Sequence, residues 1–215
     1  MKKVKNKNSK LSKKTFALIV VVSIILIFGT FFRIWQLNTI PPGLQYDEAY
    51  NGLDALKASQ TNEYRLFYPD NNGREGLYIN VVSLFLDLFG VNNFGVRFVS
   101  AVFGSLTLLG FFFLARELRL SWLSAIMGTF MMAFSFWHLN FSRIVYRGIM
   151  APFLLVWIFF FFYRGLRTKK YYNFILSGLL TGIGFHTYIS FRIAPLIFII
   201  ICFFFAYLKN KAAKQ

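Results

Sequence analysis

Long apolar runs recur along this sequence, and they constrain its fold more than any other feature. The first run covers residues 15–35 and is 21 residues long, about the length that an α-helix needs to cross the hydrocarbon core of a bilayer. The chain is 57% hydrophobic and contains 29 Phe among its 215 residues. A soluble domain of this size could not bury so much apolar surface. We therefore expect an all-α integral membrane protein.

Five further apolar runs follow, and we expect each to form a membrane span: 94–115, 121–141, 149–163, 171–188 and 193–208. Segment 76–89 is shorter and carries Asn80, Ser83 and Asp87 at roughly helical spacing, which favours a helix lying in the membrane interface. The sequence thus predicts a polytopic helix bundle with about six transmembrane helices over residues 15–208. Its first loop, 36–93, is expected to contain short juxtamembrane helices.

The distribution of Lys and Arg predicts the orientation of the bundle, because these residues accumulate on the cytoplasmic side. The tail 1–14 contains seven Lys. If segment 76–89 does not cross the membrane, nine of the later Lys and Arg residues lie on the same side as this tail and four lie on the opposite side. If the segment crosses, the nine lie opposite the tail and the four lie on its side. We therefore expect a protein of the plasma (inner) membrane with a cytoplasmic N-terminal tail and an extracytoplasmic loop 36–93. Residues 209–215 are expected to be a cytoplasmic tail or a truncated loop.

A cleaved signal peptide is the competing interpretation of the N-terminus. The first apolar run is longer than a typical signal core, and no small-x-small cleavage site follows it. An uncleaved first span is therefore better supported.

The net charge of +16 follows from this topology and from attraction to anionic lipid. The basic residues are scattered over several loops and form no stripe with interleaved aromatic residues, so the sequence does not indicate nucleic-acid binding. The single Cys202 excludes a disulfide within the chain and a thiolate metal site. We expect the lipid bilayer, and no nucleic acid, to be a partner.

The loop 36–93 is the chemically unusual part of the chain, because it holds seven of the eight acidic residues. Four arginines are expected to return to the same side of the membrane: Arg97, Arg143, Arg147 and Arg192. An arginine at a helix end can merely reach the headgroups. Several arginines opposite a carboxylate-rich loop instead suit a substrate with a nucleophilic hydroxyl and a phosphate leaving group, since guanidinium binds phosphate through a planar fork.

Several short motifs in this order resemble one family. They are Tyr46-Asp47-Glu48-Ala49-Tyr50, Asn71-Asn72-Gly73-Arg74-Glu75-Gly76-Leu77-Tyr78, Val96-Arg97-Phe98 at the start of the second span, and Phe141-Ser142-Arg143 with Arg147 and Pro152. The chain resembles the polytopic glycosyltransferases of the GT-C fold, namely the bacterial relatives of the protein O-mannosyltransferases and the aminoarabinose transferases (glycosyltransferase family 39 and the related RgtA/B/C/D-like domain). The resemblance covers nearly the whole chain after the Lys-rich tail. It is specific for the superfamily and not for a substrate.

The resemblance implies inverting transfer of a sugar from a polyprenyl-phosphate-linked donor to an acceptor hydroxyl on the extracytoplasmic side. Asp47 would be the general base, and Glu48 would orient Asp47 or the acceptor. Arg74, Arg143, Arg147 and Arg192 are candidates for binding the donor phosphate. Tyr46, Glu75, His186 and Tyr188 are expected to line the substrate cavity. The acceptor is a protein, a lipid or a glycan, and segment 76–89 would help to frame the entrance for the polyprenyl chain.

Two other roles for Asp47 stay open at the level of the residues. The carboxylate follows the turn signal Pro41-Pro42-Gly43 and could cap a helix beginning near Glu48. Asp54 lies seven residues further on and could share a helix face with Asp47, which would allow a divalent metal between them. We expect no metal site and no cofactor.

The chain departs from the family in ending after about six predicted spans, where relatives usually carry more. We therefore also consider an incomplete enzyme, and a non-catalytic membrane subunit or truncated remnant. A transporter or lipid flippase is less favoured, because no carboxylate falls in the core of any predicted span.

Overall fold

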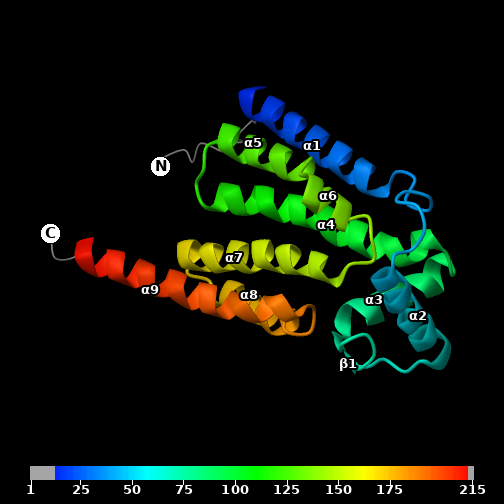
Figure 1. Cartoon of the computed structure of the whole chain (residues 1–215). Helices are drawn as coiled ribbons and strands as arrows, with labels where there is room; N and C mark the ends of the chain where they lie inside the picture. The colour runs from blue at the N-terminus through cyan, green and yellow to red at the C-terminus, as the bar shows by residue number, and fades with distance from the viewer. Residues whose placement is uncertain (1–12, 213–215) are drawn as a thin grey trace, which may run out of the picture.

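The computed structural model describes residues 13–212 and folds them into nine α-helices, two 3₁₀ turns and one short hairpin (Figure 1). The tail 1–12 and residues 213–215 lie outside the described residues. The α-helices are α1 Lys13–Ile34, α2 Tyr46–Thr61, α3 Leu77–Phe89, α4 Asn93–Glu117, α5 Trp122–Ala133, α6 Phe136–Phe141, α7 Met150–Thr168, α8 Tyr171–Gly184 and α9 Ala194–Ala212. The strands are β1 Phe67–Tyr68 and β2 Arg74–Glu75, and the 3₁₀ turns η1 Arg147–Ile149 and η2 Ile189–Ile193 precede α7 and α9.

Three described helices are long and apolar enough to cross a membrane: α1, α4, and α7 together with η1. Shorter apolar helices accompany them, among them α3, α5 and the segment from η2 into α9. The expected helical membrane protein is therefore confirmed in its class. The count of six spans stays a prediction.

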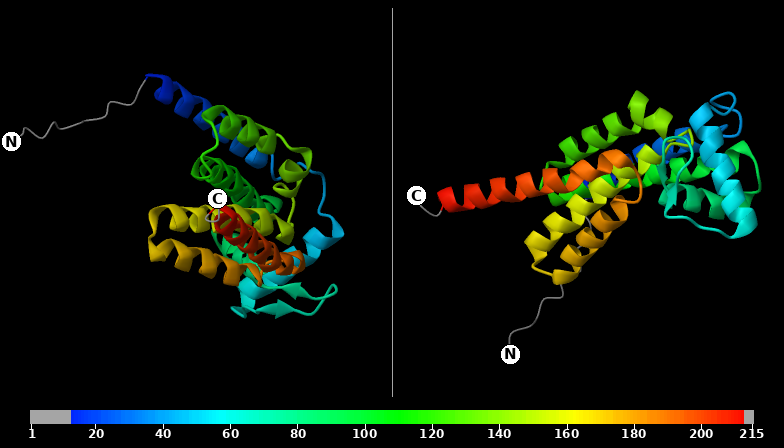
Figure 2. Two further views of the ribbon diagram at one scale, coloured as in Figure 1. Left: turned by 90° about the vertical axis from the view of Figure 1, so that its left-hand side faces the viewer. Right: turned by 60° about the horizontal axis from the view of Figure 1, so that its bottom comes forward.

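Helix α4 lies in the middle of the bundle, with α1 and α5 against one side and α7 against the other, and α8 packs on α7 (Figure 1). Glycine permits the close approach of α4 to α7. A Cβ at Gly110 would lie 2.7 Å from Val156 and 2.9 Å from Trp157, closer than packed side chains allow. Figure 2 shows α9 projecting away from the other helices along most of its length.

The predicted span 121–141 is not one helix. Helix α5 ends at Ala133, and the chain bends before α6 begins at Phe136. Arg33, which is fully buried on α1, donates to the carbonyl oxygens of Gly29 (2.6 Å) and Ala133 (3.2 Å). Its guanidinium also contacts Ser142 Oγ (3.2 Å) and His138 Nδ1 (2.7 Å). A buried cation needs several acceptors, and the bend supplies them; hydropathy alone could not reveal this interruption.

The segment between α1 and α4 forms a small subassembly at one end of the bundle (Figure 1). Helix α3 matches the predicted segment 76–89 and packs between α2 and α4. The hairpin pairs Phe67 with Glu75 and Tyr68 with Arg74 in antiparallel register. Gly76 follows β2, and a side chain would not fit at this position, because a Cβ there would lie 1.9 Å from the carbonyl oxygen of Arg65.

Candidate active site

A polar pocket of about 540 Å³ lies where the α2 end of the subassembly meets the starts of α7 and α9. Its volume is typical of small-molecule sites. Four segments line it: Asp47 and Asn51 of α2, Phe67 and residues 71–75 of the hairpin, Tyr146 and Arg147 before α7, and Tyr188, Ile189 and Arg192 of the η2 segment. The pocket therefore joins the acidic loop to the two arginine-bearing segments that are far away in the sequence.

Asp47 contributes an exposed carboxylate to this pocket. The N-cap of α2 is Gln45, and Glu48 Oε2 accepts from the Gln45 N–H at 3.0 Å. Glu48, rather than Asp47, thus interacts with the backbone at the start of the helix, so the capping alternative does not describe Asp47. Asp47 Oδ1 accepts from Asn71 Nδ2 at 2.9 Å. That amide is the one hydrogen-bond donor to the Asp47 side chain among residues 13–212.

Arg74 belongs to the wall of the pocket and is almost fully buried, with 2% of its side chain exposed. Its guanidinium forms an ion pair with Asp54, donates to Asn51 Oδ1 at 2.9 Å and donates to the Asp70 carbonyl oxygen at 3.2 Å. All three of its nitrogens therefore have protein partners. Arg74 holds α2 and the hairpin together, and its partner Asp54 does not line the pocket that contains Asp47.

Arg147 and Arg192 share one carboxylate, that of Glu75. Arg147 Nη1 lies 2.8 Å from Glu75 Oε2, and Arg192 Nη2 lies 3.3 Å from Glu75 Oε1. Arg147 also lies over the ring of Tyr188, 5.6 Å from its centroid. Two cations on one anion leave a net charge of about +1 in this wall, and the Arg192 side chain remains 58% exposed. This wall can therefore accept a further anion.

Tyr146 lines the same pocket and was not among the predicted site residues. Its hydroxyl is 3.4 Å from that of Tyr188, and its ring packs on Phe141. Burial, together with the hydrogen bond from the Tyr146 hydroxyl to Tyr188, raises the pKa of Tyr146 to about 12. The hydroxyl therefore keeps its proton at neutral pH and donates a hydrogen bond to the Tyr188 hydroxyl, which ties the segment before α7 to the segment before α9.

Glu48, predicted to assist Asp47, lies outside the pocket in what we call the sealed cluster. Its carboxylate pairs with Arg97 (Oε1 to Nε, 3.1 Å) and accepts from the Val145 N–H (3.0 Å). Arg97 is fully buried, and donates also to the carbonyl oxygens of Leu37, Pro41 and Gly43. The sealed cluster consists of Glu48, Arg97 and these backbone groups together with the Gln45 N–H. It joins the loop after α1 to α2, α4 and the segment before α7.

Three other predicted site residues also lie outside the pocket. Arg143 does not face it: the guanidinium donates to the carbonyl oxygens of Phe32, Trp35 (2.7 Å) and Ile40 (3.0 Å) and so binds the end of α1. Tyr46 is exposed and packs on Tyr50. His186 contributes a backbone contact, in which its carbonyl oxygen accepts from the Leu77 N–H at 3.2 Å. None of these three residues lines the polar pocket.

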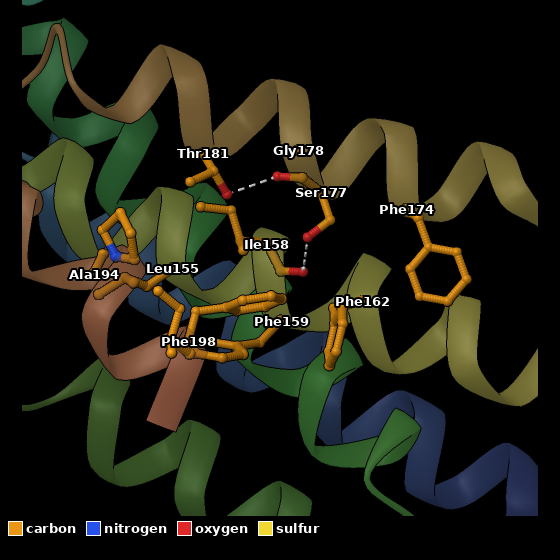
Figure 3. A pocket seen from close by; sticks show the side chains of 12 residues that line it. Leu155, Ile158, Phe159, Phe162, Phe174, Ser177, Gly178, Thr181, Ala194 and Phe198 are labelled. Carbon is orange, nitrogen blue, oxygen red and sulfur yellow. Dashed lines mark hydrogen bonds between the residues drawn. The ribbon is translucent and has the colours of Figure 1, made fainter. Parts of the chain in front are cut away.

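A second, apolar pocket of about 420 Å³ lies among α7, α8 and α9. Figure 3 shows rings of Phe159, Phe162 and Phe198 on one side and Ser177 and Thr181 on the other. The two hydroxyls are engaged, since Ser177 donates to the Ile158 carbonyl oxygen and Thr181 to that of Ser177. Among the residues whose side chains the structure describes, none that lines this pocket is ionisable, and the pocket offers mainly apolar contact.

The family model of the dolichyl-phosphate-mannose-protein mannosyltransferases matches residues 77–214. The matched stretch includes Tyr146, Arg147, Tyr188 and Arg192, and it begins just after the hairpin that carries Arg74 and Glu75. No curated protein and no solved structure matches the chain.

Proposed function

Because the chain belongs to the dolichyl-phosphate-mannose-protein mannosyltransferase family of GT-C membrane glycosyltransferases, we propose that it transfers a sugar from a polyprenyl-phosphate donor to an acceptor hydroxyl, with Asp47 as the general base. The observation that carries this proposal is the meeting of an exposed carboxylate and two arginines in one pocket. Membership of the family supports glycosyl transfer from a polyprenyl-phosphate-sugar donor. We assign the base, the phosphate ligands and the side of the membrane ourselves.

In the proposed reaction, Asp47 accepts the proton of the acceptor hydroxyl as that oxygen attacks the anomeric carbon. The bond between the anomeric carbon and the phosphate oxygen breaks, and the electron pair stays on the polyprenyl phosphate. Attack from the face opposite the leaving group inverts the configuration. Asp47 and the arginines belong to different segments of the pocket wall, which suits a base and a leaving group on opposite faces of the sugar.

Arg147 and Arg192 are the residues that we assign to the donor phosphate. Both line the pocket and already bind one carboxylate, that of Glu75. A phosphodiester presents the same kind of anionic oxygens, and charge-assisted hydrogen bonds to it strengthen as negative charge develops on the leaving group. Arg74 is assigned a supporting role, because its nitrogens are engaged by Asp54, Asn51 and Asp70.

We also propose that the pocket opens on the extracytoplasmic side of the plasma membrane, in a six-span chain with a cytoplasmic N-terminus. Basic residues gather at the end of the bundle away from the subassembly: Lys13 and Lys14 begin α1, Arg116 lies in the last turn of α4, and Lys169 and Lys170 follow α7. Lys and Arg at helix ends favour the cytoplasmic side.

The test is the Asp47→Asn variant of the whole chain, assayed in membranes with a radiolabelled short-chain polyprenyl-phosphate mannose as donor. Loss of a general base lowers the rate by about 10²–10⁴-fold, and we expect such a loss of label transfer to acceptor material. Membrane abundance should be unchanged because the Asp47 side chain is exposed.

Asp87→Asn is the matched control. Asp87 is a second exposed carboxylate of the same subassembly, accepts from Ser59, and lies outside the pocket. Its replacement should leave transfer within about twofold, as for most surface substitutions. Undiminished transfer by Asp47→Asn would refute the base assignment, and absence of transfer by the unmodified chain would favour a non-catalytic membrane subunit.

A further inference from the structure

We propose that Asn71 is the positioning residue for Asp47, and that the turn at residues 71–73 holds its amide against the carboxylate. The contact that carries this inference is the hydrogen bond from Asn71 Nδ2 to Asp47 Oδ1, 2.9 Å long. The inference rests on the proposed role of Asp47 as the base and adds to it a residue that the sequence did not single out as functional.

The turn that carries Asn71 has an uncommon backbone. Asn71, Asn72 and Gly73 follow one another with φ of 51°, 64° and 77°, all in the left-handed region. Residues with a Cβ avoid this region, and Asn tolerates it better than most because its short amide can bond locally. A conformation of this kind persists only when the surrounding structure imposes it, and such residues cluster at functional sites.

The surrounding structure fixes the turn from both ends. The Gly73 N–H donates to the Asp70 carbonyl oxygen at 3.3 Å, and Arg74 Nε donates to the same oxygen at 3.2 Å. Arg74 is itself held by Asp54 and Asn51 of α2, the helix that carries Asp47. The ring of Phe67 lies 2.6 Å from the place where a Cβ on Gly73 would be. The turn and the base are therefore anchored to the same helix.

An uncharged donor suits a base better than a cation does. Among the ion pairs of residues 13–212, none includes Asp47: Arg74 pairs with Asp54, and Arg147 and Arg192 pair with Glu75. An arginine on Asp47 would stabilise its anionic form strongly and reduce its tendency to take a proton. The Asn71 amide orients Oδ1 without bringing a full charge, so that Oδ2 remains available for the proton of the acceptor.

The experiment separates the amide from the turn. Asn71→Gly keeps the left-handed backbone, which Gly adopts readily, and removes only the side chain. We expect kcat for transfer from labelled polyprenyl-phosphate mannose to fall by about tenfold to a hundredfold, the cost of a misplaced catalytic group. The donor KM should stay within about twofold, because the phosphate ligands are untouched. Abundance and thermal stability should not fall.

Asn62→Gly is the matched control. Asn62 is the left-handed C-cap of α2 (φ 56°), is exposed, and lies outside the pocket. It should keep the kcat of the unmodified chain. Asn71→Asp retains the side-chain shape but places a second carboxylate against Asp47, and it should lose at least as much kcat as Asn71→Gly.

The outcomes distinguish this inference from the proposed function. If Asp47→Asn is inactive and Asn71→Gly keeps full kcat, the positioning role is wrong and the base assignment stands. If Asn71→Gly lowers thermal stability and raises donor KM in parallel with the loss of kcat, Asn71 serves the turn, which also overturns the inference. If Asp47→Asn retains transfer, the base assignment itself fails. In an Asp47→Asn background, Asn71→Gly should remove none of the residual rate, because coupled groups act as a unit.

Discussion

Glu48 of the sealed cluster and Asp47 of the polar pocket are neighbours in one turn of α2, yet their carboxylates differ in exposure and in hydrogen bonding. Glu48 is 2% exposed, and both of its oxygens accept from Arg97 and from backbone N–H groups. Asp47 is exposed and receives one hydrogen bond, from Asn71. Neighbours on an α-helix point about 100° apart, so one carboxylate enters the protein and the other faces the pocket.

This difference separates groups that hold the fold from groups that can react. A buried carboxylate is tolerated only when its charge and its lone pairs are satisfied, and a satisfied carboxylate has no oxygen left for a substrate. The pocket keeps unsatisfied capacity on both walls, at Asp47 and at the exposed Arg192. Arginines divide in the same way: Arg97 and Arg143 bind backbone carbonyl oxygens, whereas Arg147 and Arg192 face the pocket.

The largest effect is expected for Arg97→Leu, which removes the cation of the sealed cluster. The replacement leaves Glu48 charged and buried and deprives three carbonyl oxygens of their donor, and breaking a buried pair costs about 3–5 kcal/mol. We expect little folded protein, measured as membrane abundance and as the midpoint of thermal aggregation in detergent. A Glu48→Met, Arg97→Met double variant should remain unstable, because the carbonyl oxygens of Leu37, Pro41 and Gly43 still lack donors. An Arg97→Leu protein with unchanged stability would contradict the sealed cluster.

Arg143 and Arg147 give the next test. They lie four residues apart in sequence, but Arg143 binds backbone carbonyl oxygens whereas Arg147 lines the pocket. Arg147→Ala should raise the donor KM by about tenfold to a hundredfold, the equivalent of one lost charge-assisted contact of about 1.5–3 kcal/mol. Arg143→Ala should instead lower the thermal midpoint and leave the donor KM of the remaining folded protein near its original value. The opposite pattern would return Arg143 to the phosphate site and remove Arg147 from it.

The smallest effect is expected at Glu63, which forms an ion pair with Arg65 on the surface of the subassembly. The pair is 3.1 Å long, with side chains 62% and 48% exposed, and exposed pairs contribute at most about 1 kcal/mol. Glu63→Gln should therefore change neither the thermal midpoint nor transfer measurably. A clear loss of either would mean that exposure is a poor guide to which of the carboxylates matter.

Much of the architecture could be predicted from the sequence because hydropathy is a local property. Apolar runs predicted the long helices, and segment 76–89 appears as α3. Turn residues before Tyr46 and the concentration of acids indicated the loop, and the family resemblance is confirmed by the match over residues 77–214. The break between α5 and α6 could not be predicted, because it depends on Arg33 of a different helix.

The candidate site was predictable as a set of segments but not as a set of side chains. Asp47, Glu75, Arg147, Tyr188 and Arg192 do line one pocket, and their catalytic roles remain proposals. Glu48, Arg143, Tyr46 and His186 were predicted there from the family resemblance and the expected topology, and their side chains do not line this pocket. Asn71 and Tyr146 were missed, although consecutive Asn-Asn-Gly residues indicate a left-handed turn.

By itself, the sequence determined that this chain is a helical membrane protein, where its long helices lie, and in which loop its carboxylates gather. Those properties follow from the free energy of transferring apolar residues out of water, which is read along the chain. Only the tertiary structure decided which carboxylate is sealed and which is open, and which arginines bind backbone and which face the pocket. That division depends on which way each side chain points and on what other helices bring against it, and neither is encoded in any single stretch of the sequence.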